Sequence, residues 1–163
     1  MSAPAELDIV SHGAEQTRRL GAHLGTLLDR GDLVLLDGEF GTGKTTFTQG
    51  IAQGLGIDAR YVNSPTFTLI NEHRGARADL YHIDLYRLQG DEQVATLGLD
   101  DYLEGEGVTV IEWPEGATHW LPTEYLLVKL SHLNETKRTL RFHSQGARYA
   151  GLVDAFRKAT YGS

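Results

Sequence analysis

The sequence predicts an α/β fold, a single domain with a mixed, mostly parallel central sheet and flanking helices. Two short apolar runs, at Leu33–Asp37 and Val108–Glu112, are typical of strands that are buried on both faces of a sheet. A segment with helical spacing of its apolar residues, 44–55, directly follows the first run. Strand pairs near the middle and the end of the chain add hairpins, which makes the predicted sheet mixed rather than wholly parallel.

The first predicted element is a helix over residues 15–29, because its leucines recur at helical spacing. Gly21 and Gly25 within it would each cost about 1 kcal/mol relative to Ala, and a close approach to another backbone would explain them. The strand at Leu33–Asp37 and the helix at 44–55 come next along the chain.

The middle of the chain predicts a hairpin. Residues 64–72 start as a loop and become a strand, which a turn at 73–76 joins to an alternating strand at 79–84. Two short helical pieces follow, at 91–97 and 99–103. The remaining predicted elements complete the sheet and close the chain: strands over 108–112, 125–132 and 139–143 and a helix over 150–160.

Composition bounds the class of protein. A chain of 163 residues is predicted to form one domain, 1–163, and its 40% hydrophobic and 23% charged content is ordinary for a soluble protein. It has no apolar run of membrane-spanning length, no secretory signal and no cysteine, so we expect no membrane association and a cytoplasmic location. The net charge of −7 argues against a direct grip on nucleic acid, which a partner subunit would have to hold.

Residues 38–45 match the phosphate-binding pattern G-x-x-x-x-G-K-[ST] at every fixed position. Gly38 and Gly43 let the backbone approach phosphate oxygens, and the following helix directs its positive end at the anion. Lys44 would reach the β- and γ-phosphates, and the Thr45 hydroxyl would coordinate Mg²⁺. The sequence therefore predicts a P-loop NTPase. The loop residues expected to contact the nucleotide are Gly41, Thr42, Gly43, Lys44, Thr45 and Thr46.

A P-loop needs an acid near its Mg²⁺, at the end of a neighbouring buried strand. Glu112 ends such a strand and is the best candidate, the alternative being an acid that only faces solvent. Asp84 is the second candidate, for Mg²⁺ or for the attacking water, unless it only caps a turn. The sequence leaves open which of the two acids orients the water.

Three further residues are candidates for a switch that senses the γ-phosphate. Ser64 and Thr66 offer hydroxyls in a Ser-Pro-Thr sequence, which could also form an ordinary turn, and Trp113 directly follows Glu112. The lack of an Asn-Lys-x-Asp sequence favours ATP over GTP. The lack of an Arg-rich lid disfavours a small-molecule kinase, which stays the alternative function. The histidines show no spacing that suits zinc.

Four ordered signatures carry a family resemblance: residues 38–46, 64–69, 82–88 and 111–115. Residues 98–102, between the last two, also fit. In this order the signatures resemble the bacterial TsaE family, formerly called YjeE, whose members take part in forming threonylcarbamoyladenosine in tRNA. The P-loop alone is generic, whereas the Asp-Leu-Tyr-Arg and Glu-Trp-Pro sequences are far more specific.

The resemblance implies ATP and Mg²⁺ as cofactors, weak ATPase activity of the isolated chain, and work in a complex with the TsaB and TsaD subunits. In that family TsaD transfers the threonylcarbamoyl group, and ATP hydrolysis resets the complex between turnovers. Contact with tRNA is then indirect, through the partners. The resemblance also implies that the segment around Gly13 and Ala14 packs on the adenine.

Residue roles follow from the same resemblance. Lys44 and Thr45 are expected to bind phosphate and Mg²⁺, Glu112 to contact the Mg²⁺ site, and Asp84 to be needed for hydrolysis. Lys44, Asp84 and Glu112 are therefore the expected catalytic residues. Arg138 lies where the family has a basic residue that touches the nucleotide.

Overall fold

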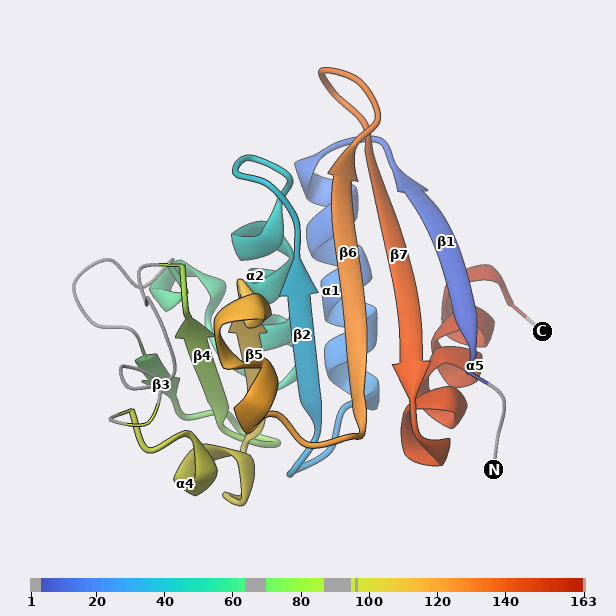
Figure 1. The fold of residues 1–163 in the computed structure, drawn as a ribbon. Helices are drawn as coiled ribbons and strands as arrows, with labels where there is room; N and C mark the ends of the chain where they lie inside the picture. The colour runs from blue at the N-terminus through green and yellow to red at the C-terminus, as the bar shows by residue number, and fades with distance from the viewer. Residues whose placement is uncertain (1–3, 64–69, 87–94, 96, 163) are drawn as a thin grey trace.

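One sheet of seven strands runs through the residues that the computed structural model describes, 4–63, 70–86, 95 and 97–162. Its order is β1-β7-β6-β2-β5-β4-β3 (Figure 1). The strands are β1 (Glu6–Ser11), β2 (Leu33–Asp37), β3 (Ile70–His73), β4 (Leu80–Asp84), β5 (Val108–Glu112), β6 (Tyr125–His132) and β7 (Arg138–Gln145).

Parallel pairing is confined to the middle of the sheet. β2 is parallel to β5 and β6, and β4 is parallel to β5. The outer pairs β3–β4, β6–β7 and β1–β7 are antiparallel. The predicted mixed sheet is confirmed. Among the described strands, however, three of six pairings are parallel, so the sheet is half rather than mostly parallel, because the hairpins β3–β4 and β6–β7 extend it on both sides.

Helices cover the two faces of the sheet unevenly. α1, α2 and α5 lie on one face, whereas α4 and η2 lie on the other and leave β6, β7 and β1 open there (Figure 1). None of the helices in the described ranges is long and apolar enough to cross a membrane. The helices are α1 (Ala14–Leu27), α2 (Lys44–Gly54), α4 (Leu99–Leu103) and α5 (Ala147–Tyr161), with the 3₁₀ segments η1 (Ala59–Tyr61) and η2 (Pro114–Trp120).

The central strand β2 is apolar because both of its faces are buried. Val34 and Leu36 belong to the core cluster that includes residues of α1, α2 and α5. Leu33 and Leu35 point the other way, into a second cluster with residues of α4 and η2. This alternation explains why the sequence of β2 is a continuous apolar run rather than an alternating one.

Helices α1 and α2 pack through glycines at backbone distance. A Cβ atom on Gly21 would lie 2.3 Å from the carbonyl oxygen of Phe47, and one on Gly25 would lie 2.3 Å from that of Ile51. From the other side, a Cβ on Gly50 would lie 2.0 Å from a carbonyl oxygen of α1. The close approach that would explain Gly21 and Gly25 is therefore present, and it fixes the position of the helix that begins in the P-loop.

The remaining differences from the predicted elements are local. β1 was not predicted, and it is an edge strand with exposed charged side chains at Glu6 and Asp8. Helix α5 begins at Ala147, three residues before the predicted start. The predicted helical piece at 91–97 lies largely outside the described residues, and the predicted loop at 64–69 lies wholly outside them.

Candidate nucleotide-binding site

The loop between β2 and α2 has the backbone that a phosphate cradle needs. Gly41 and Gly43 have φ angles of +78° and +103°, in the left-handed region that favours glycine. A Cβ on Gly38 would lie 2.4 Å from the carbonyl oxygen of Leu130 on β6, so only glycine fits there. Helix α2 starts at Lys44 with no side-chain hydrogen bond at its N-cap, which leaves backbone N–H groups of the first turn directed at the loop.

Lys44 is almost fully buried beneath this loop. Its Nζ donates hydrogen bonds to the carbonyl oxygen of Gly38 and, over 3.0 Å, to that of Glu39. Burial lowers the pKa of the Lys44 ammonium, although the Glu112 and Asp84 carboxylates act to raise it. The only cation of the loop is therefore held where it faces the two acids that the sequence singles out.

The other predicted nucleotide contacts lie around a small cavity of about 140 Å³ on the α1 side of the loop. Arg138 on β7 is held there, because its Nε and Nη2 donate to the carbonyl oxygen of Gly41 over 3.3 and 3.2 Å. Thr45 is half-buried at the start of α2. The described residues that line the cavity are Gly13, Ala14, Thr17, Gly41, Thr42, Gly43, Thr46, Thr136 and Arg138.

Asp84 and Glu112 lie side by side because they end neighbouring parallel strands. They are paired in the register of β4 and β5, and Glu112 is also paired with Leu36 of β2, just before the P-loop. The carboxyl ends of parallel strands meet at one edge of a sheet, which is why residues 28 positions apart reach the same loop. The expected gathering of Lys44, Asp84 and Glu112 is therefore present.

The two acids differ in their surroundings. Oδ1 of Asp84 accepts a hydrogen bond of 2.9 Å from the backbone N–H of Tyr86, so the turn-capping geometry is present alongside the contact with the site. Burial raises the pKa of the Asp84 carboxyl, which the bond from Tyr86 opposes. Glu112 is only 3% exposed and is hydrogen-bonded to Nε2 of the fully buried His82. The alternative of a solvent-facing Glu112 is therefore wrong.

Two acids of the site were missed by the sequence analysis. Asp37 ends β2, Glu115 lies in η2, and both lie close enough to Lys44 to influence its pKa. Burial, followed by a hydrogen bond with Asp37, raises the pKa of the Glu115 carboxyl. Within the described ranges, no three His, Cys, Asp or Glu side chains are arranged to hold a metal ion by themselves. A Mg²⁺ ion here would need phosphate or water oxygens as well.

An aromatic cluster covers the loop on this side. The rings of Phe40, Tyr86 and Trp113 lie with their centroids 4.7 to 5.1 Å apart, and Nζ of Lys44 lies 4.3 Å from the centroid of the Trp113 ring. Among the described residues, Trp113 is the only non-glycine with a positive φ, at 58°. Its place beside Lys44 is compatible with the switch role predicted for it, which stays a prediction. The other two switch candidates, Ser64 and Thr66, lie outside the described residues.

With this geometry in place, comparison with known proteins identifies the family. The family model described as "Threonylcarbamoyl adenosine biosynthesis protein TsaE" matches residues 11–140 of the chain. The chain belongs to the TsaE family. The resemblance seen in the sequence motifs is thereby confirmed, and the alternative of a small-molecule kinase gains no support.

Relatives and a solved structure of the TsaE family match over most of the chain. A protein of Bacillus subtilis named tRNA threonylcarbamoyladenosine biosynthesis protein TsaE is 39% identical over 140 residues, which are 86% of this chain and 87% of the relative. A protein of the same name from Nostoc sp. is 45% identical over 128 residues, 76% of this chain and 77% of the relative. The crystal structure of Bacillus subtilis YdiB is similar with a TM-score of 0.82 at 29% identity, and the match covers 98% of this chain and 99% of that one.

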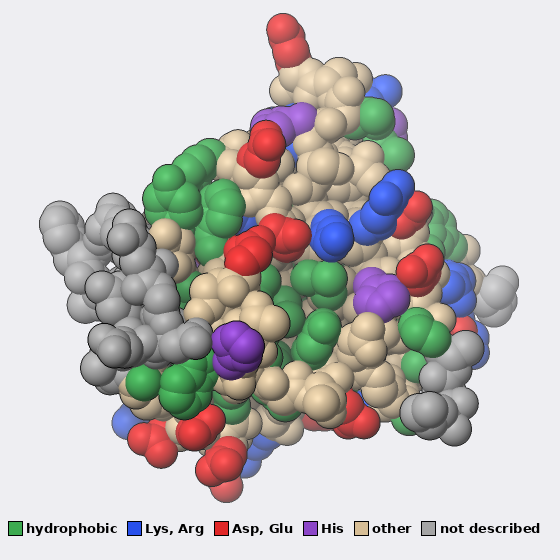
Figure 2. Space-filling view, viewed as in Figure 1, with side chains coloured by type: hydrophobic (Ala, Val, Ile, Leu, Met, Phe, Trp, Pro, Cys, Tyr) green, Lys and Arg blue, Asp and Glu red, His purple; other side chains and the backbone are tan. Residues whose placement is uncertain are grey.

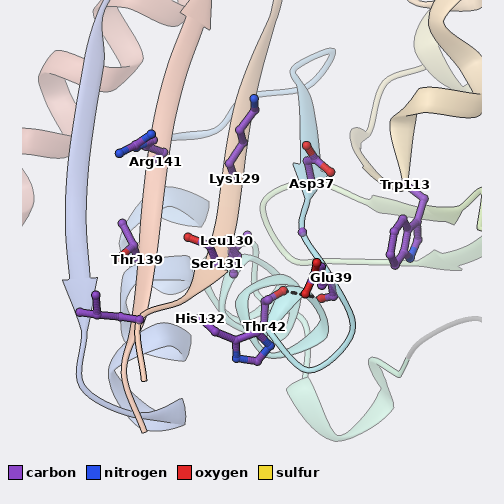
Figure 3. Close-up of a pocket in the computed structure, with 12 residues that line it drawn as sticks. Asp37, Glu39, Thr42, Trp113, Lys129, Leu130, Ser131, His132, Thr139 and Arg141 are labelled. Atoms are coloured by element: carbon purple, nitrogen blue, oxygen red, sulfur yellow. Dashed lines mark hydrogen bonds between the residues drawn. The ribbon is translucent and has the colours of Figure 1, made fainter. Parts of the chain in front are cut away.

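A second hollow flanks the P-loop of this TsaE-family chain, on the open face of β6 and β7. It measures about 670 Å³ and reaches from Asp37 and Thr42 of the loop region to Lys129 and Arg141, which stand opposite each other in register (Figure 3). On the face seen in Figure 2, the described Lys and Arg side chains lie among acidic ones and form no extended basic area. This face therefore lacks the surface that a direct grip on nucleic acid usually needs.

Proposed function

We propose that this protein is the ATP-binding and ATP-hydrolysing subunit of the complex that forms threonylcarbamoyladenosine in tRNA. The observation that carries the proposal is the meeting of Lys44, Asp84 and Glu112 at one edge of the sheet in a chain of the TsaE family. A P-loop lysine with two strand-end acids is the set of groups that phosphoryl transfer to water requires.

The chain's own residues fit a nucleoside triphosphate. The left-handed glycines and the N-terminus of α2, whose N-cap has no side-chain hydrogen bond, suit the phosphates, and Lys44 lies close enough to both acids for their charges to act on its pKa. Arg138, held against Gly41, and the nearby segment of Gly13 and Ala14 suit the rest of the nucleotide. Gly41, Gly43 and Arg138 line one cavity together with Gly13 and Ala14, which supports ATP as the ligand.

Thr45 and Glu112 are the residues that would hold Mg²⁺, which when bound neutralises charge on the β- and γ-phosphates. Thr45 is in the first turn of α2, and Glu112 ends β5, paired with Leu36 of the strand that leads into the loop. Oδ1 of Asp84 accepts a hydrogen bond from the Tyr86 N–H, and Oδ2 would orient an attacking water. Asp84 and Glu112 therefore share the tasks of orienting water and completing the ion's surroundings, with the division between them left open.

The partners are part of the proposal. The relatives' names assign those proteins to threonylcarbamoyladenosine biosynthesis in tRNA, and the family implies the TsaB and TsaD subunits as partners. Hydrolysis would reset the complex, while TsaD performs the transfer and tRNA is held by the partners. The net charge of −7 supports this indirect contact with tRNA, and a cytoplasmic location follows from the substrate.

One experiment tests the proposal directly. ATP hydrolysis by the purified chain is measured alone, then with a purified TsaB–TsaD pair, then with tRNA added, by following released phosphate. We expect slow hydrolysis alone and a clear stimulation by the pair. Absence of both stimulation and complex formation would overturn the assignment. Transfer of phosphate to an added hydroxyl compound, in place of release to water, would favour the kinase alternative.

A further inference from the structure

A buried histidine lies behind Glu112, the acid that faces the P-loop. His82 is fully buried on β4, and its Nε2 is hydrogen-bonded to Oε2 of Glu112, the last residue of β5. A carboxylate can only accept, so Nε2 carries the proton and donates it. The other ring nitrogen, Nδ1, has no hydrogen-bond partner among the described residues. Within the described residues, the bond to Glu112 is thus the only hydrogen bond of this imidazole.

The register of the strands explains how the pair forms. His82 is paired with Val110, and Asp84 with Glu112, so all four share one face of the β4–β5 pair under the period-2 rule. Val110 belongs to the core cluster on the α2 side, which places Glu112 and His82 beneath the P-loop helix. Leu36, paired with Glu112, belongs to the same cluster. The histidine is therefore positioned behind the carboxylate rather than beside the phosphates.

We infer that His82 is a positioning residue that fixes the Glu112 carboxylate, so that Oε1 is the oxygen presented to the ion and water at the P-loop. The inference rests on the proposed function. An imidazole that is buried with one ring nitrogen unpaired lowers the stability of the fold. The hydrogen bond from His82 to Glu112 is therefore expected to have a role other than stabilising the fold. A glutamate has three rotatable bonds, and a fixed Oε2 removes the rotamers that would turn it away from the loop.

The test measures binding rather than turnover. The affinity for a non-hydrolysable ATP analogue is determined by calorimetry with and without Mg²⁺ for the wild type and for His82→Leu. We expect His82→Leu to lose about 10-fold or more of the Mg²⁺-dependent gain in affinity, the effect typical of a lost second partner of a metal ligand. The Mg²⁺-free affinity should not change. His82→Gln, whose amide reaches about as far as Nε2, should restore most of the gain.

Two controls separate positioning from general damage to the core. Thr109→Val removes a buried polar group from β5, at the end of the strand away from Glu112, and should leave the gain intact. In a Glu112→Gln background, His82→Leu should add no further loss, because a residue that acts through Glu112 has nothing left to position. If His82→Leu does not fold, His82→Asn, too short to reach Glu112, replaces it with the same expected loss.

The outcomes are distinct. Wild-type protein that binds no Mg²⁺–ATP analogue overturns the proposed function and this inference with it. Wild-type binding that His82→Leu or His82→Asn retains in full overturns this inference alone. This inference alone is also overturned if the loss of Mg²⁺-dependent affinity caused by His82→Leu adds fully to the loss caused by Glu112→Gln. A Mg²⁺-dependent loss that Gln at this position restores, and that disappears in the Glu112→Gln background, supports the inference.

Discussion

The two halves of the sheet differ in whether their charged side chains are buried or exposed. β2, β5 and β4 are parallel and covered on both faces, and their carboxyl ends hold Asp37, Asp84 and Glu112 around Lys44. β6, β7 and β1 are antiparallel and covered on one face, and there the charged side chains pair at the surface, as in Asp8 with Arg141 at 3.4 Å. Burial lowers the pKa of Lys44 and raises the pKa of Asp84.

This difference indicates which half of the sheet holds the groups that can take part in a reaction. Electrostatic interactions strengthen where water is excluded and weaken at an exposed face. The parallel half therefore has the acids and the lysine that can act on a phosphate, whereas the antiparallel half adds Arg138 at the cavity beside the loop and pairs other charges at its surface. The predictions below test this contrast by changing matched residues of the two halves.

The largest effect is expected at Lys44. Lys44→Ala should lower ATP hydrolysis at least about 100-fold, because it removes the charge nearest the phosphates. Lys129→Ala is the matched control. Lys129 is a lysine on β6, in the antiparallel half, and it lines the second hollow. This variant should hydrolyse ATP like the wild type. Equal rates for both variants in a phosphate-release assay would remove the basis of the comparison.

The second effect concerns the helices that cover the two halves. Gly50→Ala should lower the free energy of unfolding by about 1–3 kcal/mol, because the new Cβ would lie 2.0 Å from the carbonyl oxygen of Arg18. Gly151→Ala on α5, where no described residue beyond the neighbouring turns of the helix lies within 4 Å of the new Cβ, should raise it by up to about 1 kcal/mol. Urea denaturation measures both, and opposite signs of the two changes are the result expected.

The third effect depends on pH. Burial raises the folded-state pKa of Asp84 above its unfolded value, so the folded protein binds more protons in the window between the two, and stability falls as pH rises through that window. Asp84→Asn should remove this loss. The variant should be more stable than the wild type at neutral pH, with the difference vanishing at pH below the unfolded-state pKa, while hydrolysis is lost. A stability difference that grows on acidification would contradict the burial of this carboxyl.

The smallest effect is expected on the open face. Arg141→Ala should change the free energy of unfolding by at most about 1 kcal/mol, because its contact with Asp8 is exposed on both sides. Asp8→Ala should have a similarly small effect, and the double variant should add little. A fall of several kcal/mol in the free energy of unfolding, measured by heat or urea, would contradict the small electrostatic contribution expected of this half.

Much of the parallel half could be predicted from the sequence, because its signals are local. The apolar runs at Leu33–Asp37 and Val108–Glu112 mark strands buried on both faces, and the P-loop pattern fixes what lies between strand and helix. Placing Glu112 near the loop needed only the rule that the acid of a P-loop ends a neighbouring buried strand, whereas Asp84 was chosen from its local sequence and the family resemblance. The membership of the TsaE family followed from the order of the motifs.

What could not be predicted depends on register and packing. The bond from His82 to Glu112 exists because β4 and β5 pair with a particular offset, which no single segment specifies. Asp37 ends β2 directly before the P-loop, whereas Glu115 comes near Lys44 only because η2 lies against the loop. β1 was missed because an edge strand with exposed charges has a weak apolar signal.

The glycine contact between α1 and α2 has a mechanical consequence. Carbonyl oxygens of one helix lie against glycines of the other, with no side chain between them at these contacts, so we expect α1 and α2 to act as one stiff body. Gly13, before α1, and Lys44, at the start of α2, both stand at the N-terminal end of that body, because the two helices run in the same direction. We therefore expect both ends of a nucleotide to be gripped by parts that do not move against each other. Any motion that reports the loss of a γ-phosphate then has to arise on the opposite side of the loop, where β4, β5 and their acids lie.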